Sequence, residues 1–438
     1  MSSRLLLSCS GLLLAGLSLA SARAAEPTTD ALAQAVDGQV LAWRRDIHEH
    51  PELGNRETRT AKLVADQLRS LGLEVRTGVA TTGVVAVLKG AKPGPRVALR
   101  ADMDALPVTE RSALPFASKV RSVFNDQDVG VMHACGHDSH TAMLLGVATA
   151  LASMKAQLPG EVLFVFQPAE EGVPDGEKGG AKEMLAQGIF RDFKPEAVFG
   201  LHVWSTLNAG KIGVRSGPAM AASDRFRITV KGRQTHGSRP WGGVDPVLAA
   251  AEIITSSQAI ISRRTNISKL PAVVTFAAIH GGVRYNIIPD EVEMIGTIRT
   301  FDESVRQAIH ADLKNVATHV AAAHGATVDA QVPDTDGNPV LVNDAALTAR
   351  MRPSLEKAAG AGNVVDEPLT MGAEDFALYA QEVPSLFFFV GATPVGKDAS
   401  TAPSNHSPEF FLDESALPLG TRALLQVTLD YLRGVGAP

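Results

Sequence analysis

Apolar segments alternate with helical segments through the first half of the chain, and this alternation limits the folds that it can adopt. We expect strands where β-branched or large apolar residues lie between turn residues, at 74–79, 84–88, 96–99, 162–166 and 197–201. Helical patterns occupy 30–71 with a break at 54–57, 139–156 and 180–187. Strands that alternate with helices predict an α/β layer built on a mixed, mostly parallel sheet.

A different order of elements occupies the next part of the chain. It predicts a strand at 226–230, a helix at 246–263, strands at 272–279 and 292–298, a helix at 303–324 and a strand at 327–332. This β-α-β-β-α-β order is a split βαβ unit of ferredoxin-like type. After Pro333 the α/β pattern resumes, with a strand at 386–390 and a helix at 417–432. We therefore expect an α/β protein of two domains, in which a catalytic domain (25–219 and 334–438) is interrupted by an inserted α+β lid or dimerisation domain (220–333).

The first 24 residues predict an export signal. Arg4 gives a positive start, residues 5–20 are largely apolar, and Ala22-Arg23-Ala24 has the small residues that a signal peptidase requires. The apolar run is too short and wrongly flanked for a stable membrane span, although a membrane anchor is the alternative. We expect cleavage after Ala24 and a periplasmic or secreted protein that then makes no membrane contact.

The charge balance excludes some classes of partner. The chain has 41 Lys and Arg against 47 Asp and Glu, a formal net charge of −6 without a basic stripe. This argues against nucleic acid and anionic membranes as partners. An aromatic share of 5% also argues against stacking platforms for bases.

The cysteine count points to a bound or buried thiol. Of the two cysteines, Cys9 lies in the predicted signal, so the mature chain carries Cys135 alone. In an oxidising compartment Cys135 cannot form an internal disulfide. A lone thiol is protected there when it is buried or coordinates a metal.

Polar side chains come shortly after three of the predicted strands. Asp102 and Asp104 follow the strand at 96–99, Glu170 and Glu171 follow the strand at 162–166, and His202 follows the strand at 197–201. In an open parallel sheet, ligands bind at the edge formed by the carboxyl ends of the strands. We therefore expect these side chains to converge at a site.

The segment Met132–His140 adds a dense set of nitrogen, sulfur and oxygen ligands. Cys135 and His137 are good donors for Zn²⁺ and neighbouring transition metals, and His406 follows late in the chain. The alternative is a polar loop with an inert buried cysteine. The sequence contains no Gly-x-Ser-x-Gly and no His-Glu-x-x-His motif, which argues against the corresponding hydrolase classes.

The adjacent residues Glu170 and Glu171 suggest two different roles for their carboxylates. In extended backbone, neighbouring side chains point to opposite sides, so one carboxylate can coordinate metal while the other transfers a proton. The alternative is two solvated glutamates in a turn.

Taken together, these motifs resemble the aminoacylase/carboxypeptidase family of co-catalytic metallopeptidases. The resemblance is to the amidohydrolase branch with hippurate hydrolase and the auxin–amino-acid conjugate hydrolases. It spans essentially the whole mature chain, and the matching segments are Arg45–Leu53, Arg100–Pro107, Met132–Asp138, Gln167–Gly172, His236–Pro240, Asn286–Pro289, Met371–Phe376 and His406–Pro408.

The resemblance implies two divalent metal ions per subunit. It assigns them the ligands Cys135, His137, Glu171, His202 and His406. Zinc fits these donors best, and manganese, cobalt or nickel can serve in the same geometry. It also implies that Glu170 is the general base and acid, and that Asp104 orients a histidine ligand.

The resemblance further implies a homodimer whose inserted domain reaches the neighbouring subunit's cleft. His236 would then stabilise the oxyanion in trans, while Asn286 and Arg299 would hold the substrate carboxylate. As loop or strand residues, each of these has an ordinary solvated alternative. Gly237-Ser238 stands where the branch often has two alanines, and Ala373 where serine is usual, which bears on substrate preference.

We therefore expect an exported metal-dependent amidohydrolase. Its small-molecule substrates would be N-acyl amino acids or dipeptides, from which it releases a free amino acid. The alternatives are a metallocarboxypeptidase on longer peptides, a non-catalytic periplasmic binding protein of the same fold, and a metal-storage or structural zinc protein.

Overall fold

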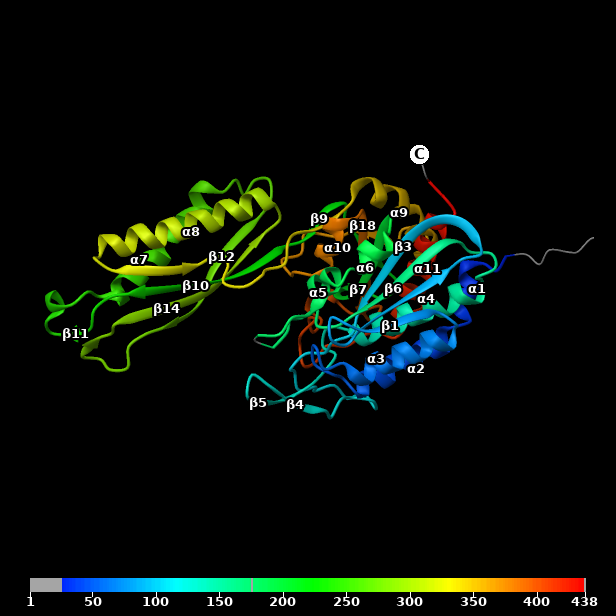
Figure 1. Ribbon diagram of the computed structural model, residues 1–438, viewed down its shortest axis with the longest axis horizontal. Coiled ribbons are helices and arrows are strands. Elements are labelled where there is room, and N and C mark those ends of the chain that lie inside the picture. The colour runs from blue at the N-terminus through cyan, green and yellow to red at the C-terminus, as the bar shows by residue number, and fades with distance from the viewer. Residues whose placement is uncertain (1–25, 175, 437–438) are drawn as a thin grey trace, which may run out of the picture.

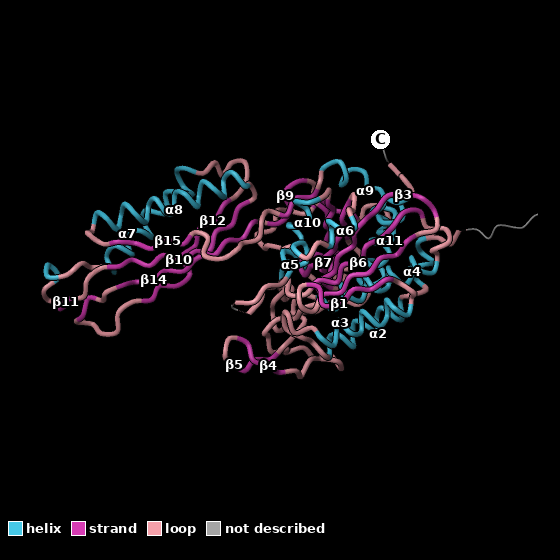
Figure 2. The backbone as a smooth tube through the Cα atoms, in the orientation of Figure 1, coloured by secondary structure: helices cyan, strands magenta, loops and turns pink. Residues whose placement is uncertain are grey.

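The computed structural model describes residues 26–174 and 176–436, which form two lobes (Figure 1). The predicted export signal, 1–24, lies outside the described residues. The larger lobe is built on an eight-stranded sheet and the smaller on a four-stranded sheet. Figure 2 shows the strands of these two sheets as separate groups joined through loops.

The large sheet is parallel at its centre and mixed towards its edges. Its strand order is β1 (Glu74–Val79), β2 (Gly83–Lys89), β6 (Pro159–Gln167), β3 (Lys92–Asp102), β7 (Ala197–Asn208), β18 (Ser385–Thr393), β8 (Ile212–Val214) and β17 (Val364–Asp366). Strands β6, β3, β7 and β18 run parallel to one another. Strands β2 and β8 pair antiparallel to β6 and β18. At the edges, β1 pairs antiparallel with β2 and β17 pairs parallel with β8. The predicted mixed, mostly parallel sheet is confirmed.

Helices cover both faces of this sheet, so its strands are buried on both sides. Leu99 and Phe199 face the larger core, formed with α1 (Thr29–Gln34), α2 (Asp37–Glu49), α3 (Thr58–Ser70), α4 (His137–Ser153), α9 (Ala345–Ala359) and α11 (Ala416–Leu432). Ala98 and Val198 face the second core, formed with α5 (Gly180–Ala186), α6 (Ile189–Phe193) and α10 (Phe376–Glu382). Among the described residues, no helix combines the length and hydropathy needed to cross a membrane.

The smaller lobe has the predicted β-α-β-β-α-β order. Its antiparallel sheet runs β12 (Ala272–His280), β14 (Glu291–Thr300), β10 (Ala222–Lys231) and β15 (Thr327–Gln331). Helices α7 (Pro246–Ala259) and α8 (Glu303–Ala323) cover one face around a core that includes Phe226 and Met294. Asp245 caps α7 and Pro246 takes its first position, as expected at a helix start. The ribbon of β11 (Thr235–His236) and β13 (Ile287–Ile288) lies at the end remote from the larger lobe (Figure 1).

The structure corrects the expected ends of several elements. Strand β3 continues to Asp102 and β7 continues past His202, so these two residues lie within strands and not beyond them. A polar residue usually marks the end of a buried strand. Asp102 and His202 are nevertheless buried inside their strands, where each contacts another polar side chain. Glu170 and Glu171 lie in a turn after Ala169 (φ +52°), so the expectation of extended backbone there was wrong.

Short elements without a clear hydrophobic period were missed. These are β4 (Arg121–Phe124), β5 (Gln127–Gly130), β8, β9 (Gly217–Met220), β11, β13, β16 (Leu341–Asn343), β17, α6, α10 and the one-turn helices Pro240–Gly242 and Ala399–Thr401. Helix α9 was also missed although it has 15 residues, and it contains Pro353, a residue that argues against a helix interior. The predicted break at 54–57 lies between α2 and α3, but the further division of the first helical segment into α1 and α2 was not predicted. Elements of a few residues carry too few side chains for their period to be recognised.

Candidate metal centre

The start of helix α4 sets the positions of Cys135 and His137. Gly136 between them has φ +94°, and a Cβ atom there would lie 2.3 Å from Cγ2 of Val203. Only glycine avoids both the unfavourable backbone region and this clash. The chain can therefore turn tightly against β7, with Cys135 and His137 on either side of the turn.

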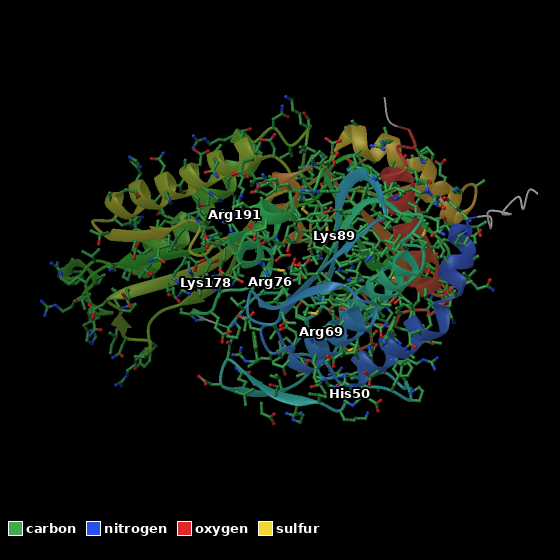
Figure 3. All side chains as sticks on the ribbon, turned by 45° about the vertical axis from the view of Figure 1, so that its right-hand side comes forward. His50, Arg69, Arg76, Lys89, Lys178 and Arg191 are labelled. Carbon is green, nitrogen blue, oxygen red and sulfur yellow. The ribbon has the colours of Figure 1, made fainter. Side chains whose placement is uncertain are left out.

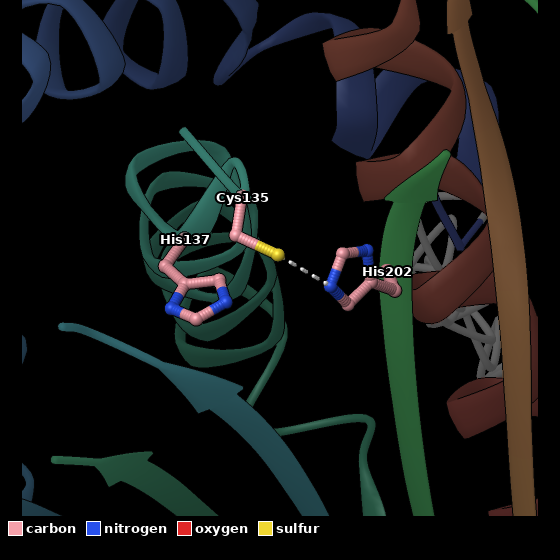
Figure 4. Close-up of side chains that lie close together, drawn as sticks. All are labelled: Cys135, His137 and His202. Atoms are coloured by element: carbon pink, nitrogen blue, oxygen red, sulfur yellow. Dashed lines mark hydrogen bonds between the residues drawn. The ribbon is translucent and has the colours of Figure 1, made fainter. Parts of the chain in front are cut away.

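Two groups of potential metal ligands share Cys135. One is Cys135, His137 and His202, and the other is Cys135, Glu171 and His406; within each group the ligand atoms lie within 4.8 Å of one another. Figure 4 shows the first group, in which Cys135 Sγ is 3.3 Å from His202 Nε2. In the second, His406 Nε2 is 3.2 Å from Cys135 Sγ and 2.9 Å from Glu171 Oε1. The structure thus brings together all five residues predicted as ligands.

Hydrogen bonds fix the histidine rings for coordination. His137 Nδ1 donates to the Asp104 carbonyl oxygen at 2.8 Å, and His202 Nδ1 donates to the Val203 carbonyl at 2.7 Å. Each Nε2 is then left with its lone pair, and the buried Nε2 of His137 has no hydrogen-bond partner among the described residues. The Asp104 carboxylate also accepts from the Glu171 N–H at 3.0 Å. Asp104 therefore orients two of the predicted ligands.

The loop that carries His406 is tied to the same cluster. Asn405 Nδ2 donates to the carbonyl oxygens of Cys135 (3.2 Å) and Val203 (3.1 Å). His406 has φ +72°, and its N–H donates to the Ala134 carbonyl at 2.8 Å. These bonds place a partly exposed histidine over the buried thiol.

The residues present fit divalent cations. Burial raises the pKa of the Cys135 thiol well above its usual range, and the nearby carboxylates of Glu171 and Glu170 raise it further. A divalent cation offsets both effects and favours the thiolate. The unpaired Nε2 of His137 and the mixed sulfur, nitrogen and oxygen donors match the preferences of zinc.

Glu170 lies beside the cluster but belongs to neither of the two ligand groups that share Cys135. Its Oε2 is 4.0 Å from His137 Nε2, and its side chain is 7% exposed. Burial raises the pKa of Glu170 well above its usual range, and the carboxylates of Glu374 and Glu171 add to this. A carboxyl group placed beside the ligand cluster is in position to accept a proton and to deliver it.

A buried guanidinium network behind Glu170 was missed by the sequence reasoning. Arg100 bonds Gln167 (2.9 Å) and Asp102 (2.6 Å) and contacts Glu374 (2.9 Å) and Asp375 (3.0 Å). The signal was present, because an arginine inside an apolar strand requires buried acidic partners.

The Arg100 network continues to the ligand strand. Asp102 Oδ1 accepts from His140 Nδ1 at 2.6 Å, and His140 Nε2 accepts from the Val203 N–H at 2.9 Å. Val203 directly follows the predicted ligand His202 on β7. His140 is therefore a neutral ring that joins the buried charges to the backbone of the metal cluster.

The structure does not bring the predicted residues of the smaller lobe to the cluster. His236 and Asn286 lie together at the remote tip, where Gly237 N donates to the Asn286 carbonyl at 2.8 Å. Arg299 lies near the other end of β14, paired with Ser223, and burial lowers its pKa. A strand rise of about 3.3 Å per residue puts Asn286 and Arg299 more than ~25 Å apart. Within one chain they cannot hold the same carboxylate.

A cleft of about 870 Å³ opens from Glu170 and Glu171 towards the base of the smaller lobe. Ser223, Arg306 and Asn338 line its other side. Lys178, labelled in Figure 3, lines it from the loop that follows Glu171. The candidate metal centre therefore faces a cleft large enough for a bound small molecule.

Comparisons with known proteins show which family the chain resembles in sequence and fold. A family model described as peptidase family M20/M25/M40 matches residues 98–430. Thermostable carboxypeptidase 2 of Saccharolobus solfataricus is 41% identical over 397 residues, which cover 90% of this chain and 96% of that protein. IAA-amino acid hydrolase ILR1-like 4 of Arabidopsis thaliana is 39% identical over 395 residues, covering 90% of this chain and 86% of that protein. The Bacillus subtilis YXEP protein, described as a dinuclear metal-binding peptidase of the M20 family, matches with a TM-score of 0.74 and 36% identity, over 91% of this chain and 99% of that one.

Replacing the shared cysteine should disturb both metal positions. After saturation with zinc and dialysis, we expect about two ions per wild-type chain and fewer than about one in Cys135→Ala, because the thiolate belongs to both groups. His202→Ala, which removes a donor from one group, should retain about one ion. Elemental analysis of the dialysed proteins measures this, with His236→Ala as a histidine control at wild-type content. Two ions retained in Cys135→Ala would contradict the shared site.

Proposed function

The chain belongs to peptidase family M20/M25/M40, and on that premise we propose that it releases a free amino acid from N-acyl amino acids or dipeptides by amide hydrolysis. The observation that carries this proposal is the position of Glu170. It is a buried carboxyl group beside two ligand groups that share one thiol, at the mouth of a cleft. The comparisons support a metal-dependent hydrolase of this family. The substrate class is our proposal.

We propose zinc as the resident metal. The ligands would be Cys135, His137, Glu171, His202 and His406, whose sulfur and imidazole donors favour zinc over harder cations. When bound, such ions polarise the scissile carbonyl and acidify water.

Glu170 supplies the proton transfer in the proposed reaction. As a carboxylate it takes the proton of the attacking water, and as a carboxylic acid it gives that proton to the amide nitrogen as the C–N bond breaks. Burial and the neighbouring carboxylates raise its pKa, which favours the protonated form that delivers the proton in the second step. The Arg100–Asp375 pair lies directly behind it, and the Asp375 N–H is directed at Glu170 Oε1, 3.5 Å away.

Substrate recognition would require a second subunit. Arg299 is paired with Ser223, which lines the cleft of the same chain, and would bind a substrate carboxylate there. His236 and Asn286 lie at the remote tip and would act in the cleft of the other subunit of a homodimer. Two features support dimerisation through the smaller lobe: β12 is an edge strand bearing the 56% exposed Ile279, and α7 exposes apolar Val247 and Leu248.

A carboxypeptidase acting on longer peptides is the second candidate. The cleft of about 870 Å³ exceeds what an N-acetyl amino acid fills, so it has room for further residues on the acyl side. The relative from Saccharolobus solfataricus is named as a carboxypeptidase. Substrate length separates this activity from aminoacylase activity.

Export is also part of the proposal. It is supported by the positive start, the apolar run and Ala22-Arg23-Ala24. We expect the protein recovered from a bacterial periplasm to begin at Ala25, as intact-mass measurement would show. An uncleaved chain in the cytosolic fraction would contradict export.

Amino-acid release from a panel of substrates tests the reaction. The panel contains N-acetyl and N-benzoyl amino acids, dipeptides and peptides of three to five residues, each with and without chelator. We expect the fastest release from N-acyl amino acids or dipeptides, loss of activity on chelation, and recovery with zinc. Faster release from the longer peptides would favour the carboxypeptidase, and no release from any substrate would favour a binding protein.

Glu170→Gln is the matched control for this panel. The amide has the shape of the carboxyl group and cannot accept the proton, so kcat should fall by about 10³-fold or more. Metal content and the midpoint of thermal unfolding should stay close to those of the wild type. An active Glu170→Gln enzyme would contradict the assigned base.

Mixing inactive variants tests the contribution of the second subunit. His236→Ala and Glu170→Gln homodimers should each be nearly inactive. After subunit exchange, a hybrid holds one cleft with both Glu170 and an incoming His236. We expect up to about a quarter of wild-type activity in an equimolar mixture, since half of the dimers are hybrids with one intact site. A mixture that stays inactive although mass spectrometry detects hybrids would contradict action in trans.

A further inference from the structure

The ring of His236 is held by Ser238, two residues further along the chain. The Ser238 N–H donates to His236 Nδ1 at 3.0 Å, and Ser238 Oγ lies 2.7 Å from the same nitrogen. A backbone N–H can only donate, so Nδ1 is the acceptor and the neutral ring carries its proton on Nε2. Nε2 has no hydrogen-bond partner among the described residues, and the residue is exposed at the tip of the smaller lobe.

The Ser238 hydroxyl adds to what the backbone N–H provides. Its Oγ–H can donate to the same lone pair of Nδ1, which opposes the alternative tautomer. A donor at Nδ1 also polarises the ring and makes Nε2–H a stronger donor. Two contacts from one residue restrict rotation of the imidazole, which matters for an exposed side chain that nothing else in the described chain orients.

Gly237 allows the turn formed by His236 and Ser238 to lie directly against Asn286. A Cβ atom at Gly237 would lie 3.2 Å from the Asn286 carbonyl carbon and 3.3 Å from its Cα, closer than ordinary contact. The Gly237 N–H donates to the Asn286 carbonyl oxygen at 2.8 Å. His236 and Asn286 are therefore held at one place by the two residues that follow His236.

We propose that Ser238 is a positioning residue for catalysis. It fixes His236 as the Nε2–H tautomer and aims that N–H at the oxyanion formed in the cleft of the second subunit. This inference rests on the proposed function, in which His236 stabilises the oxyanion in trans. The pair Gly237-Ser238, which the sequence suggested would bear on substrate preference, is here assigned to the chemical step.

Steady-state kinetics give the first measurement. Ser238→Ala should lower kcat by about 3- to 10-fold, the size expected for one neutral hydrogen bond, and leave KM within about twofold. Ser238→Thr, which keeps the hydroxyl, should restore kcat. Ser262→Ala is the matched control, because Ser262 is an exposed serine of the same lobe that donates only to the Gln258 carbonyl. A wild-type kcat in Ser238→Ala, or a loss that Ser238→Thr does not restore, would overturn the proposal.

The tautomer itself gives a second measurement that needs no substrate. In ¹⁵N spectra of the imidazole groups, assigned by comparison with His236→Gln, the wild type should show His236 with its proton on Nε2. Ser238→Ala should show an increased share of the Nδ1–H form. A wild-type ring protonated on Nδ1, or an unchanged tautomer ratio in Ser238→Ala, would overturn the proposal. This experiment decides whether Ser238 fixes the His236 tautomer even if the panel shows no hydrolysis, so the failure of this inference and that of the proposed function are distinguishable.

Discussion

A single buried guanidinium, that of Arg100, connects the parts of the candidate centre. It is 1% exposed and contacts Asp102, Glu374 and Asp375, while Gln167 bonds both Arg100 and Asp375. Removing one partner from such a group leaves an uncompensated buried charge, at a cost of about 3–5 kcal/mol. Strands β3 and β6 and the start of α10 are therefore held in one arrangement by electrostatics as well as by packing.

One guanidinium cannot neutralise all the acids around it. Burial raises the pKa of Asp375 to about 7 and also raises that of Glu374, although Arg100 opposes both shifts. The centre thus holds more carboxyl groups than its described cations balance. Such a surplus of carboxyl groups favours the binding of divalent cations by the neighbouring ligand groups.

Much of the centre could be predicted, because in an α/β sheet the position of a site residue near a strand end depends mainly on that one strand. Each polar residue near a strand end is placed by its own strand, so Glu171 and His202 could be assigned to one edge of the sheet without coordinates. Arg100 could not be assigned a role, because two of its three acidic partners, Glu374 and Asp375, lie 274 and 275 residues away in a segment that no strand pattern connects to β3. The turn at Glu170 depends on Ala169 adopting a positive φ, which its side chain does not favour. Likewise, the separation of Asn286 from Arg299 follows from the length of β14 and is invisible in a list of motifs.

The elongated shape of the smaller lobe would make it a lever if it rotates against the larger lobe. Its fulcrum is where Ser223 pairs with Asn338, and Arg299 lies close to that point, whereas His236 lies at the far end. For an arm of about 30 Å, a swing of about 10° displaces the far end by roughly 5 Å and a residue near the fulcrum hardly at all. Small rotations of the lobe would therefore hardly move Arg299, the proposed carboxylate anchor, while they engage or withdraw His236, the proposed oxyanion donor. In the proposed dimer that donor serves the other subunit, so the angular position of one lobe would set the turnover of its neighbour.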